Sequence, residues 1–277
     1  MNTQTIGLVG CAFAGLTFGQ GTVGAGSPVT GTFSAATSFN SRPIAPPTVA
    51  GAPYSGEQVF ESVQVLADGT RITRKSGGQN QKMYRDFAGR IRIDRALFPA
   101  AAMSGNSAAR DAVVSEIYDP IASFRYTLDS INHVAHRQKL QPVTPPAVTN
   151  PAAAPIPAGS PAPRENARPM PTMSSESLGT QLINGVQAEG HRTIQTIPAE
   201  AQGNDRPITV TVETWYSPEL KLTVLSKRLD PRSGDATTQI LNLSRAEPDP
   251  FLFTVPAGYS IVDETGPFTI RSGSSKP

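Results

Sequence analysis

A dense run of proline divides this chain into two parts. Ten of the thirty residues at 142–171 are proline, and most of the others are small. Proline lacks the backbone donor that helices and sheet ladders need, and at this density it favours an extended polyproline II spacer. We therefore predict a proline- and alanine-rich linker or insertion over residues 141–175, with a folded segment on each side of it.

Both flanking segments have the pattern of short antiparallel strands. Residues 208–216 read ITVTVETWY, in which apolar and polar side chains alternate as in a half-buried strand. Asp68-Gly69 and Asn184-Gly185 suit type I′ hairpins, because both central residues of such a turn need positive φ. In residues 90–95, the two isoleucines share one predicted face. Arg90, Arg92 and Asp94 share the other, which we expect to be wet.

Joining the two segments gives the simplest fold. Each segment alone leaves exposed edges, whereas one sheet protects them, and a long insertion costs little loop-closure entropy. The sequence therefore predicts a mainly β fold with a curved antiparallel sheet that resembles a half-barrel. Its first half is residues 54–140 and its second half residues 176–264.

The remaining segments lack such patterns. Residues 20–53 consist largely of Gly, Ser, Thr, Ala and Pro with Arg42 as the single charge, so we predict disorder there. We expect residues 265–277 to be a flexible tail.

The start of the chain resembles an export signal. Residues 6–18 form a short apolar stretch, and Thr17 and Gly19 stand at the −3 and −1 positions of a cleavage site. We predict a signal peptide over residues 1–19 and a location in the periplasm or cell envelope. No Lys or Arg precedes Arg42, and LVGC at residues 8–11 resembles a lipobox, so a lipid anchor at Cys11 is the alternative. No run of eighteen apolar residues predicts a transmembrane span.

Several turn and strand-end motifs of the second half carry a family resemblance. They are TWYSPEL at residues 214–220, DPRSG at 230–234, EPDP at 247–250 and VPAGY at 255–259. With ADGTRI at 67–72 and DFAGRIR at 86–92, they resemble uncharacterised exported bacterial proteins. Those proteins are similar to the outer-membrane lipoprotein-sorting (lipoprotein carrier) superfamily. The resemblance implies a curved antiparallel half-barrel whose apolar concavity carries acylated proteins, and it assigns no functional residue here.

Catalytic motifs are absent from the sequence. It has no G-x-S-x-G elbow and no phosphate- or dinucleotide-binding glycine fingerprint, so we expect no enzyme, no cofactor and no catalytic site. His133 and His136 would lie on opposite faces of a strand, which predicts surface histidines and no metal site. Strand carboxylates are expected on wet faces: Glu61, Glu116, Glu189 and Glu213. The net charge of +2 is spread along the chain, which does not indicate nucleic-acid binding.

Two functions remain open. In the first, the concave face binds a lipid, an acyl chain or an apolar peptide. Its candidate liners serve equally well as core residues: Phe60, Phe124, Tyr126, Val210, Val212, Leu222 and Val224. In the second, the protein is an envelope structural or protein-interaction scaffold that binds its partner through an edge strand. Trp215 shares its predicted face with Thr209, Thr211 and Glu213, and would be either a groove residue or a core aromatic.

The signal-peptide hypothesis predicts that the mature protein lacks Cys11. The intact mass of the secreted form should match a chain that begins near Gln20. A mass that corresponds to an N-terminal Cys11 with a diacylglycerol increment would contradict it.

Overall fold

Nearly all regular structure in the described part of the chain is β-strand. The computed structural model describes residues 36–39, 43, 46–75, 80–98, 112–141 and 169–271. The predicted signal peptide and most of the predicted linker lie outside these residues. The described elements are β1 (Ala36–Phe39), β2 (Tyr54–Val65), β3 (Arg71–Lys75), β4 (Gln81–Arg85), β5 (Ile91–Ala96), β6 (Val113–Asp119), β7 (Phe124–Asp129), β8 (Val134–Lys139), β9 (Thr172–Ile183), β10 (Val186–Ile197), β11 (Ile208–Ser217), β12 (Leu222–Asp230), β13 (Gly234–Ser244), the 3-10 helix η2 (Pro250–Phe253), β14 (Ser260–Asp263) and β15 (Phe268–Arg271).

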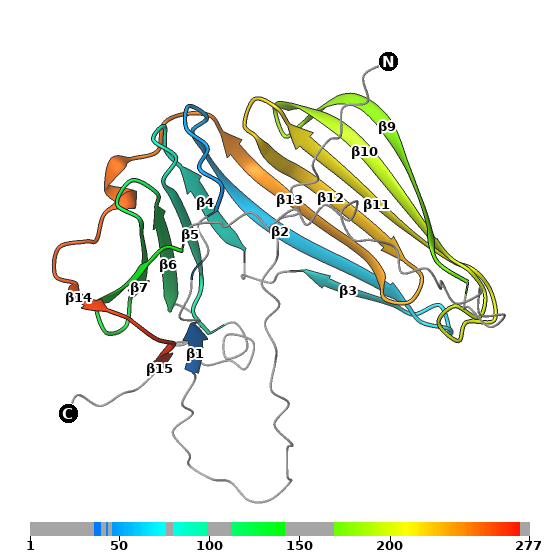
Figure 1. Cartoon of the computed structure of the whole chain (residues 1–277), viewed down its shortest axis with the longest axis horizontal. Helices are drawn as coiled ribbons and strands as arrows, with labels where there is room; N and C mark the ends of the chain where they lie inside the picture. Colours follow the sequence, from blue (N-terminus) through cyan, green and yellow to red (C-terminus); the bar gives the residue numbers. More distant parts are fainter. Residues whose placement is uncertain are drawn as a thin grey trace, which may run out of the picture. The chain divides into compact units, whose positions relative to one another are not determined.

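The long strand β2 joins the two predicted halves. One of its edges pairs with β4 near the start and with β3 near the end, and its other edge pairs with β13. The resulting 13-stranded sheet has the order β14-β8-β7-β6-β5-β4-β2-β13-β12-β11-β10-β9, with β3 beside β2 (Figure 1). All of its pairs are antiparallel except β14 with β8. The predicted fold class, a curved antiparallel sheet that does not close, is confirmed.

Strand register assigns each side chain to one of two faces, because residues directly opposite each other share a face. We call the inner face the one that carries the row Gly56, Met83, Ile93, Glu116, Thr127 and His136. The outer face carries the row Ser55, Tyr84, Arg92, Ile117, Tyr126 and Arg137.

The sheet curls near the β9–β10 turn. Asn184 Nδ2 donates to the Ile240 carbonyl at 2.6 Å, although β10 and β13 are separated by two strands. At a spacing of about 4.8 Å per strand, a flat sheet would put such strands about 14 Å apart. An apolar cluster fills the curled region: Tyr54, Val186, Ala188, Trp215, Leu220 and Val224.

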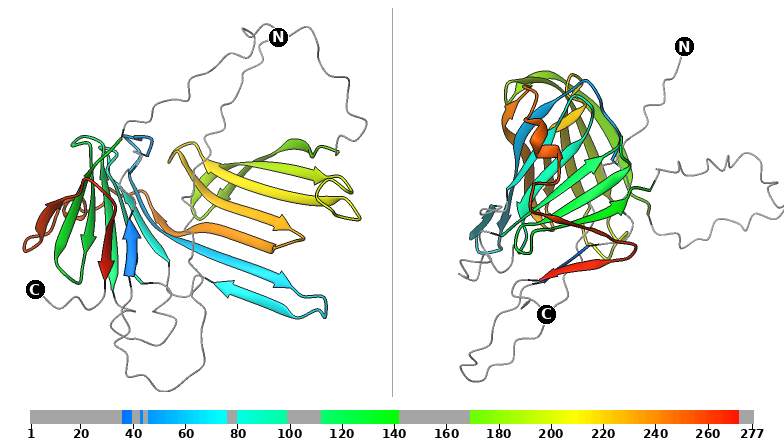
Figure 2. Two further views of the ribbon diagram at one scale, coloured as in Figure 1. Left: turned by 60° about the horizontal axis from the view of Figure 1, so that its bottom comes forward. Right: turned by 90° about the vertical axis from the view of Figure 1, so that its left-hand side faces the viewer.

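The first half of the sheet is covered on both faces. The small β1–β15 sheet packs on the inner face, where Phe39, Phe268 and Ile270 join Val114 in one buried cluster (Figure 2). On the outer face, Phe253 of η2 packs with Ile117.

This outer cover corrects the predicted wet face of β5. The Arg92 guanidinium donates to the Leu252 carbonyl at 2.8 Å and to Ser115 Oγ at 2.9 Å. Its side chain is only 15% exposed, and that of Asp94 only 17%. The alternation along the strand predicted the faces correctly, but it could not reveal a cover supplied from residues about 160 positions later.

Three segment boundaries also need correction. β1 lies inside the predicted disordered segment 20–53, and β15 lies inside the predicted tail 265–277. They form because they pair with each other, with the Phe39 and Phe268 rings stacked at 4.9 Å. β9 begins at Thr172, inside the predicted linker 141–175, because its first residues pair with the end of β10.

The two predicted tight turns differ. Asn184 and Gly185 both have positive φ, 49° and 83°, as a type I′ turn requires. At Asp68-Gly69 only the glycine has positive φ, and Leu66 both accepts from Gly69 N and donates to the Thr70 carbonyl. This is the longer hairpin turn closed by a glycine in the left-handed region, so the type I′ prediction is wrong there.

Trp215 is a core residue that lies between two β-bulges. β11 pairs with β10 without a shift, so Trp215 shares the face of Glu213 as predicted, and the register shifts lie beside it, in β12 and in β9. Its side chain is 8% exposed and lies over Gly190, where an added Cβ would approach Trp215 Cζ3 at 2.7 Å and Leu178 Cβ at 2.9 Å.

No helix among the described residues is long and apolar enough to cross a membrane.

The contact between Trp215 and Gly190 predicts the effect of one methyl group. Gly190→Ala should lower the free energy of unfolding by about 1–3 kcal/mol, because the ring or the strand must shift to admit it. Urea unfolding followed by Trp215 fluorescence measures this loss. Gly266→Ala is the matched control, since its Cβ would meet nothing within 4 Å. Equal stability of the two variants would contradict the packing described.

Candidate ligand-binding face

The strands β3, β2, β13, β12 and β11 form an arm of the sheet with an unusual inner face. Register places Arg74, Ser62, Ala236, Arg228 and Val212 in one row across it. The neighbouring row contains Phe60, Thr238 and Ser226. We call these residues together the arm surface. Between Phe60 and Val212 it carries mainly small side chains, which lets a ligand approach the backbone closely.

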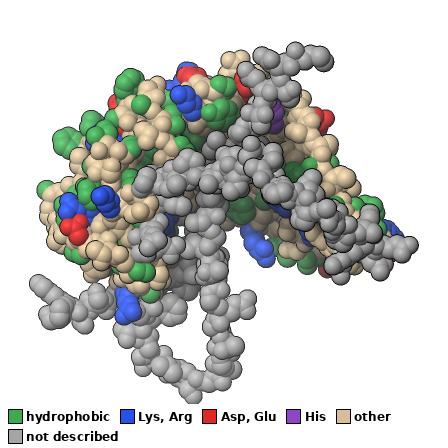
Figure 3. Space-filling model, in the orientation of Figure 1, with side chains coloured by type: hydrophobic (Ala, Val, Ile, Leu, Met, Phe, Trp, Pro, Cys, Tyr) green, Lys and Arg blue, Asp and Glu red, His purple; other side chains and the backbone are tan. Residues whose placement is uncertain are grey.

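The arm surface combines apolar and basic side chains. Phe60 is 45% exposed, although it is a large apolar residue. Arg74 and Arg228 are both exposed and stand on either side of Ser62 and Ala236. In the space-filling view, hydrophobic and basic side chains border the hollow beneath the middle of the sheet (Figure 3).

A buried carboxylate fixes one of these arginines. Asp230 Oδ2 accepts from Arg228 and from Arg232, each at 2.9 Å. The hydrogen bonds from Arg232, with a further contribution from Arg228, hold the pKa of the Asp230 carboxyl well below its usual range. No local pattern indicated that Arg74 and Arg228 would lie in one row, because the β2–β13 register that aligns them is a long-range pairing.

The seven predicted liners do not lie on one face. Register places three on the inner face: Phe60, Val210 and Val212. Leu222 lies opposite Ser217 beyond the register shift in β12, and both Leu222 and Val224 pack with Trp215. The other two, Phe124 and Tyr126, lie on the outer face. Tyr126 packs against the cluster around Phe253, and the Arg137 guanidinium lies 4.9 Å from the Phe124 ring centroid.

Three of these five liners are buried. Leu222 and Val224 pack in or against the Trp215 cluster, with Val224 0% exposed. Val210 is only 2% exposed. Phe60 and Val212 are therefore the predicted liners that belong to the arm surface.

A polar cluster occupies the inner face of the first half. Glu116 Oε1 accepts from Arg95 at 2.6 Å, and Glu116 Oε2 accepts from the Tyr118 hydroxyl at 3.0 Å. Arg125 lies 3.5 Å from Glu116 and also donates to Gln138 Oε1. Burial, with Glu116 nearby, raises the pKa of Tyr118 to about 12, so its phenol stays neutral.

This cluster is a structural element of the interior. Glu116 is 9% exposed, so its predicted place on a wet face is wrong. Glu61 and Glu213 instead pair with Lys75 and Arg192 on their own part of the sheet. Each of these carboxylates has a basic partner, as expected for ion pairs that support a sheet.

The histidines are also structural. His136 Nδ1 lies 2.8 Å from Glu264 Oε1, and its ring stacks on Phe268 at 4.2 Å. Its side chain is 15% exposed, so the expectation of a surface histidine is wrong here. His133 occupies the β7–β8 turn and contacts the Tyr259 ring edge-on at 5.3 Å. Within the described part of the chain, no three His, Cys, Asp or Glu residues come together as a metal site.

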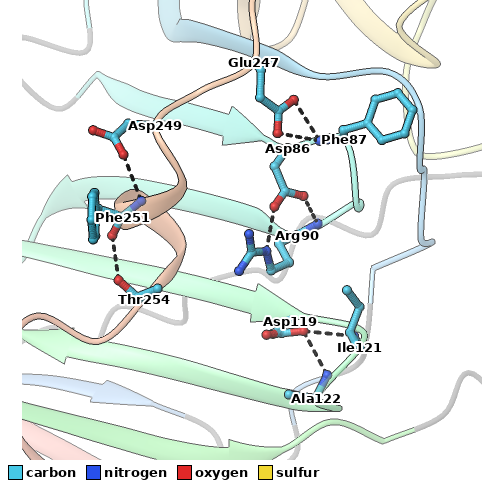
Figure 4. A network of polar contacts seen from close by, with 10 residues as sticks. All are labelled: Asp86, Phe87, Arg90, Asp119, Ile121, Ala122, Glu247, Asp249, Phe251 and Thr254. Atoms are coloured by element: carbon cyan, nitrogen blue, oxygen red, sulfur yellow. Dashed lines mark hydrogen bonds and ion pairs between the residues drawn. The ribbon is translucent and has the colours of Figure 1, made fainter.

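One end of the sheet displays apolar side chains on turns held by carboxylates (Figure 4). Glu247 accepts from the Phe87 amide at 3.0 and 3.1 Å, Asp119 from the Ile121 amide at 2.9 Å, and Asp249 from the Phe251 amide at 2.9 Å. Phe87, Ile121 and Phe251 are 65%, 72% and 82% exposed.

A hollow of about 330 Å³ lies elsewhere on the sheet. Its largely polar lining includes Thr180, Gln187, Glu219 and Arg245. It does not have the lining expected for an apolar ligand.

Comparison with known proteins finds weak matches among solved structures. No protein-family model and no curated protein matches the chain. A crystal structure of an uncharacterised conserved protein from Thermus thermophilus matches over 77% of this chain and 91% of that one, at 7% identity and a TM-score of 0.36. The Pseudomonas aeruginosa MucA/MucB complex matches over 76% of this chain but only 58% of that chain, at 11% identity and a TM-score of 0.35. A LolA superfamily protein from Nitrosomonas europaea matches over 76% and 92%, at 6% identity and a TM-score of 0.24.

The polar cluster predicts a large effect of one substitution. Glu116→Ala should lower the free energy of unfolding by about 3–5 kcal/mol, because it leaves Arg95 and Arg125 without their shared carboxylate in the interior. Chemical denaturation measures the loss. Glu219→Ala removes an exposed ion pair to Arg245 and should cost at most about 1 kcal/mol. Similar small losses in both variants would show that Glu116 does not hold the cluster together.

Proposed function

We propose that this chain is an exported, non-enzymatic protein of the cell envelope that binds an apolar ligand on the arm surface. The ligand class is a lipid, an acyl chain or an apolar peptide. Export rests on the signal-like stretch at residues 6–18. The binding role rests on the difference between the two faces of the arm, one of which carries ion pairs and the other apolar side chains.

The observation that carries the proposal is an apolar face to which no second layer is assigned among the described residues. The outer face of the arm carries ion pairs, Glu61 with Lys75 and Arg192 with Glu213. The inner face carries Phe60 and Val212. A sheet normally buries its apolar face against another layer. The covering elements β1–β15 and η2 pack on the first half, and neither contributes to the apolar cluster beneath the arm.

The composition of the arm surface suits an amphiphile. A half-exposed Phe60 next to small residues provides an apolar contact area, and apolar area removed from water stabilises a complex by about 25 cal/mol per Å² before the costs of association. Arg74 and Arg228 beside it would attract an anionic head group or a peptide carboxylate. The hydroxyl groups of Ser62, Thr238 and Ser226 add polar contacts that would orient such a ligand.

A scaffold function is the second candidate, and β9 favours it. This strand ends the sheet, and its side chains are exposed along nearly its whole length. An unpaired strand edge is a ready template for an extended segment of another chain.

The apolar-ligand proposal predicts that introducing one charged side chain on the inner face abolishes binding. The protein, purified from a bacterial periplasm, should carry a lipid or acylated species in native mass spectrometry and release it on organic extraction. Val212→Asp should remove that species, because it puts a carboxylate into the apolar contact area. Phe60→Ser, at a half-exposed position, should weaken uptake of a fluorescent fatty acid without unfolding the sheet.

Thr209→Asp is the matched control, since Thr209 is exposed on the same strand and faces the other side. It should bind as the unmodified protein does. A protein that carries no ligand and takes up no added lipid would overturn the proposal and favour the scaffold.

A further inference from the structure

A polar groove lies where the β9–β10 hairpin meets the turn between β11 and β12. The hollow of about 330 Å³ adjoins a second hollow of about 200 Å³, and the two share Thr180, Gln187 and Glu219. The turn contributes Pro218 as well as Glu219. We call the two hollows together the hairpin groove. The volume of its larger part is at the lower end of the range for small-molecule sites.

Strand register brings the side chains of the hairpin groove to one face. Glu189 lies opposite Thr180 of β9 and opposite Tyr216 of β11, and Gln187 lies opposite Leu182. Both rows lie between the hairpin turn and the register shift in β9, so a single alternation applies to them. The β10 residues that alternate with Gln187 and Glu189 are buried in the apolar cluster at the curl, which gives the groove a packed floor.

The charges of the hairpin groove disfavour an anionic ligand. Arg245 is the basic side chain of its lining, and it is already paired with Glu219 at 3.2 Å. Glu189 adds a second carboxylate to the lining. The groove therefore carries more negative than positive charge, which would repel an anion.

We propose that the hairpin groove binds a short neutral oligosaccharide. Sugar hydroxyl groups both donate and accept hydrogen bonds, and the Gln187 amide, the Thr180 hydroxyl and the Glu189 carboxylate together offer both kinds of partner. The C–H face of a sugar ring needs an apolar contact, which the exposed Tyr216 and Leu182 provide. This ligand differs from that of the arm surface, and the two proposals are independent.

A peptide is the alternative ligand for such polar side chains. An extended peptide binds mainly through backbone hydrogen bonds to an unpaired strand edge. At the hairpin groove, β10 is paired on both sides, with β9 and with β11. The floor of the groove therefore has no free backbone ladder to offer. A saccharide, which the side chains alone can hold, fits this arrangement better.

Saturation-transfer difference NMR of the full chain with maltotriose, cellotriose and chitotriose tests the proposal. At least one of these trisaccharides should bind, with the strongest saturation on ring C–H protons. Tyr216→Ala should weaken that binding about tenfold because it removes the aromatic contact, whereas Tyr216→Phe keeps the ring and should bind as the unmodified protein does. Gln187→Ala should weaken it about two- to tenfold through the loss of a hydrogen bond.

Thr209→Ala is the matched control, since Thr209 is exposed on the same strand as Tyr216 and faces the other side. It should leave binding unchanged, and far-ultraviolet circular dichroism should show that every variant is folded. Uptake of the fluorescent fatty acid should be the same in Tyr216→Ala as in the unmodified protein, which separates this proposal from that for the arm surface.

Two results would overturn the proposal. One is the absence of saturation transfer to all three trisaccharides, and transfer to trialanine in their place would assign the groove to a peptide. The other is equal trisaccharide binding by Tyr216→Ala and the unmodified protein.

Discussion

The pairing of β2 with β13 is the interaction on which the rest of the structure depends. Residues 57–63 of β2 lie opposite residues 235–241 of β13, which joins segments separated by the whole proline-rich stretch. Without this pairing, each half of the sheet would expose one more unsatisfied edge. The long β2 also bridges β4 and β3 on its opposite side, so that the first half and the arm share one strand. The row of side chains that forms the arm surface exists only because of this register.

The two halves of the sheet bury their side chains in different ways. The first half is covered on both faces, by β1–β15 and by η2, and it buries an ion-pair cluster around Glu116. The second half curls on itself near Trp215, where β-bulges turn tryptophan, valine and leucine side chains into one cluster. Away from this cluster the arm is less buried, and Phe60 is left half exposed. Curvature thus provides the core at one end of the arm and a candidate binding surface at the other.

Local patterns predicted what depends on local interactions. Alternation placed the strands of both halves, and Asn184-Gly185 placed a turn with the expected backbone. Phe60 and Val212 were predicted as liners because they are apolar strand residues, yet Phe124 and Tyr126 have the same local pattern and lie on the opposite face.

Long-range pairing accounts for what the patterns missed. β1 and β15 escaped prediction because they are joined across 231 positions, as in the contact of Ser38 Oγ with Thr269 Oγ1 at 3.1 Å. The cover over Arg92 and the alignment of Arg74 with Arg228 likewise depend on pairing that composition and spacing do not encode.

If β2 unites the sheet, its two halves should unfold together. Equilibrium urea unfolding can be followed by Trp215 fluorescence, which reports on the arm, and by far-ultraviolet circular dichroism, which reports on all strands. We expect coincident transitions with one midpoint, as for a single cooperative unit. A fluorescence transition separate from the circular dichroism transition would show two independent domains and contradict the central role of β2.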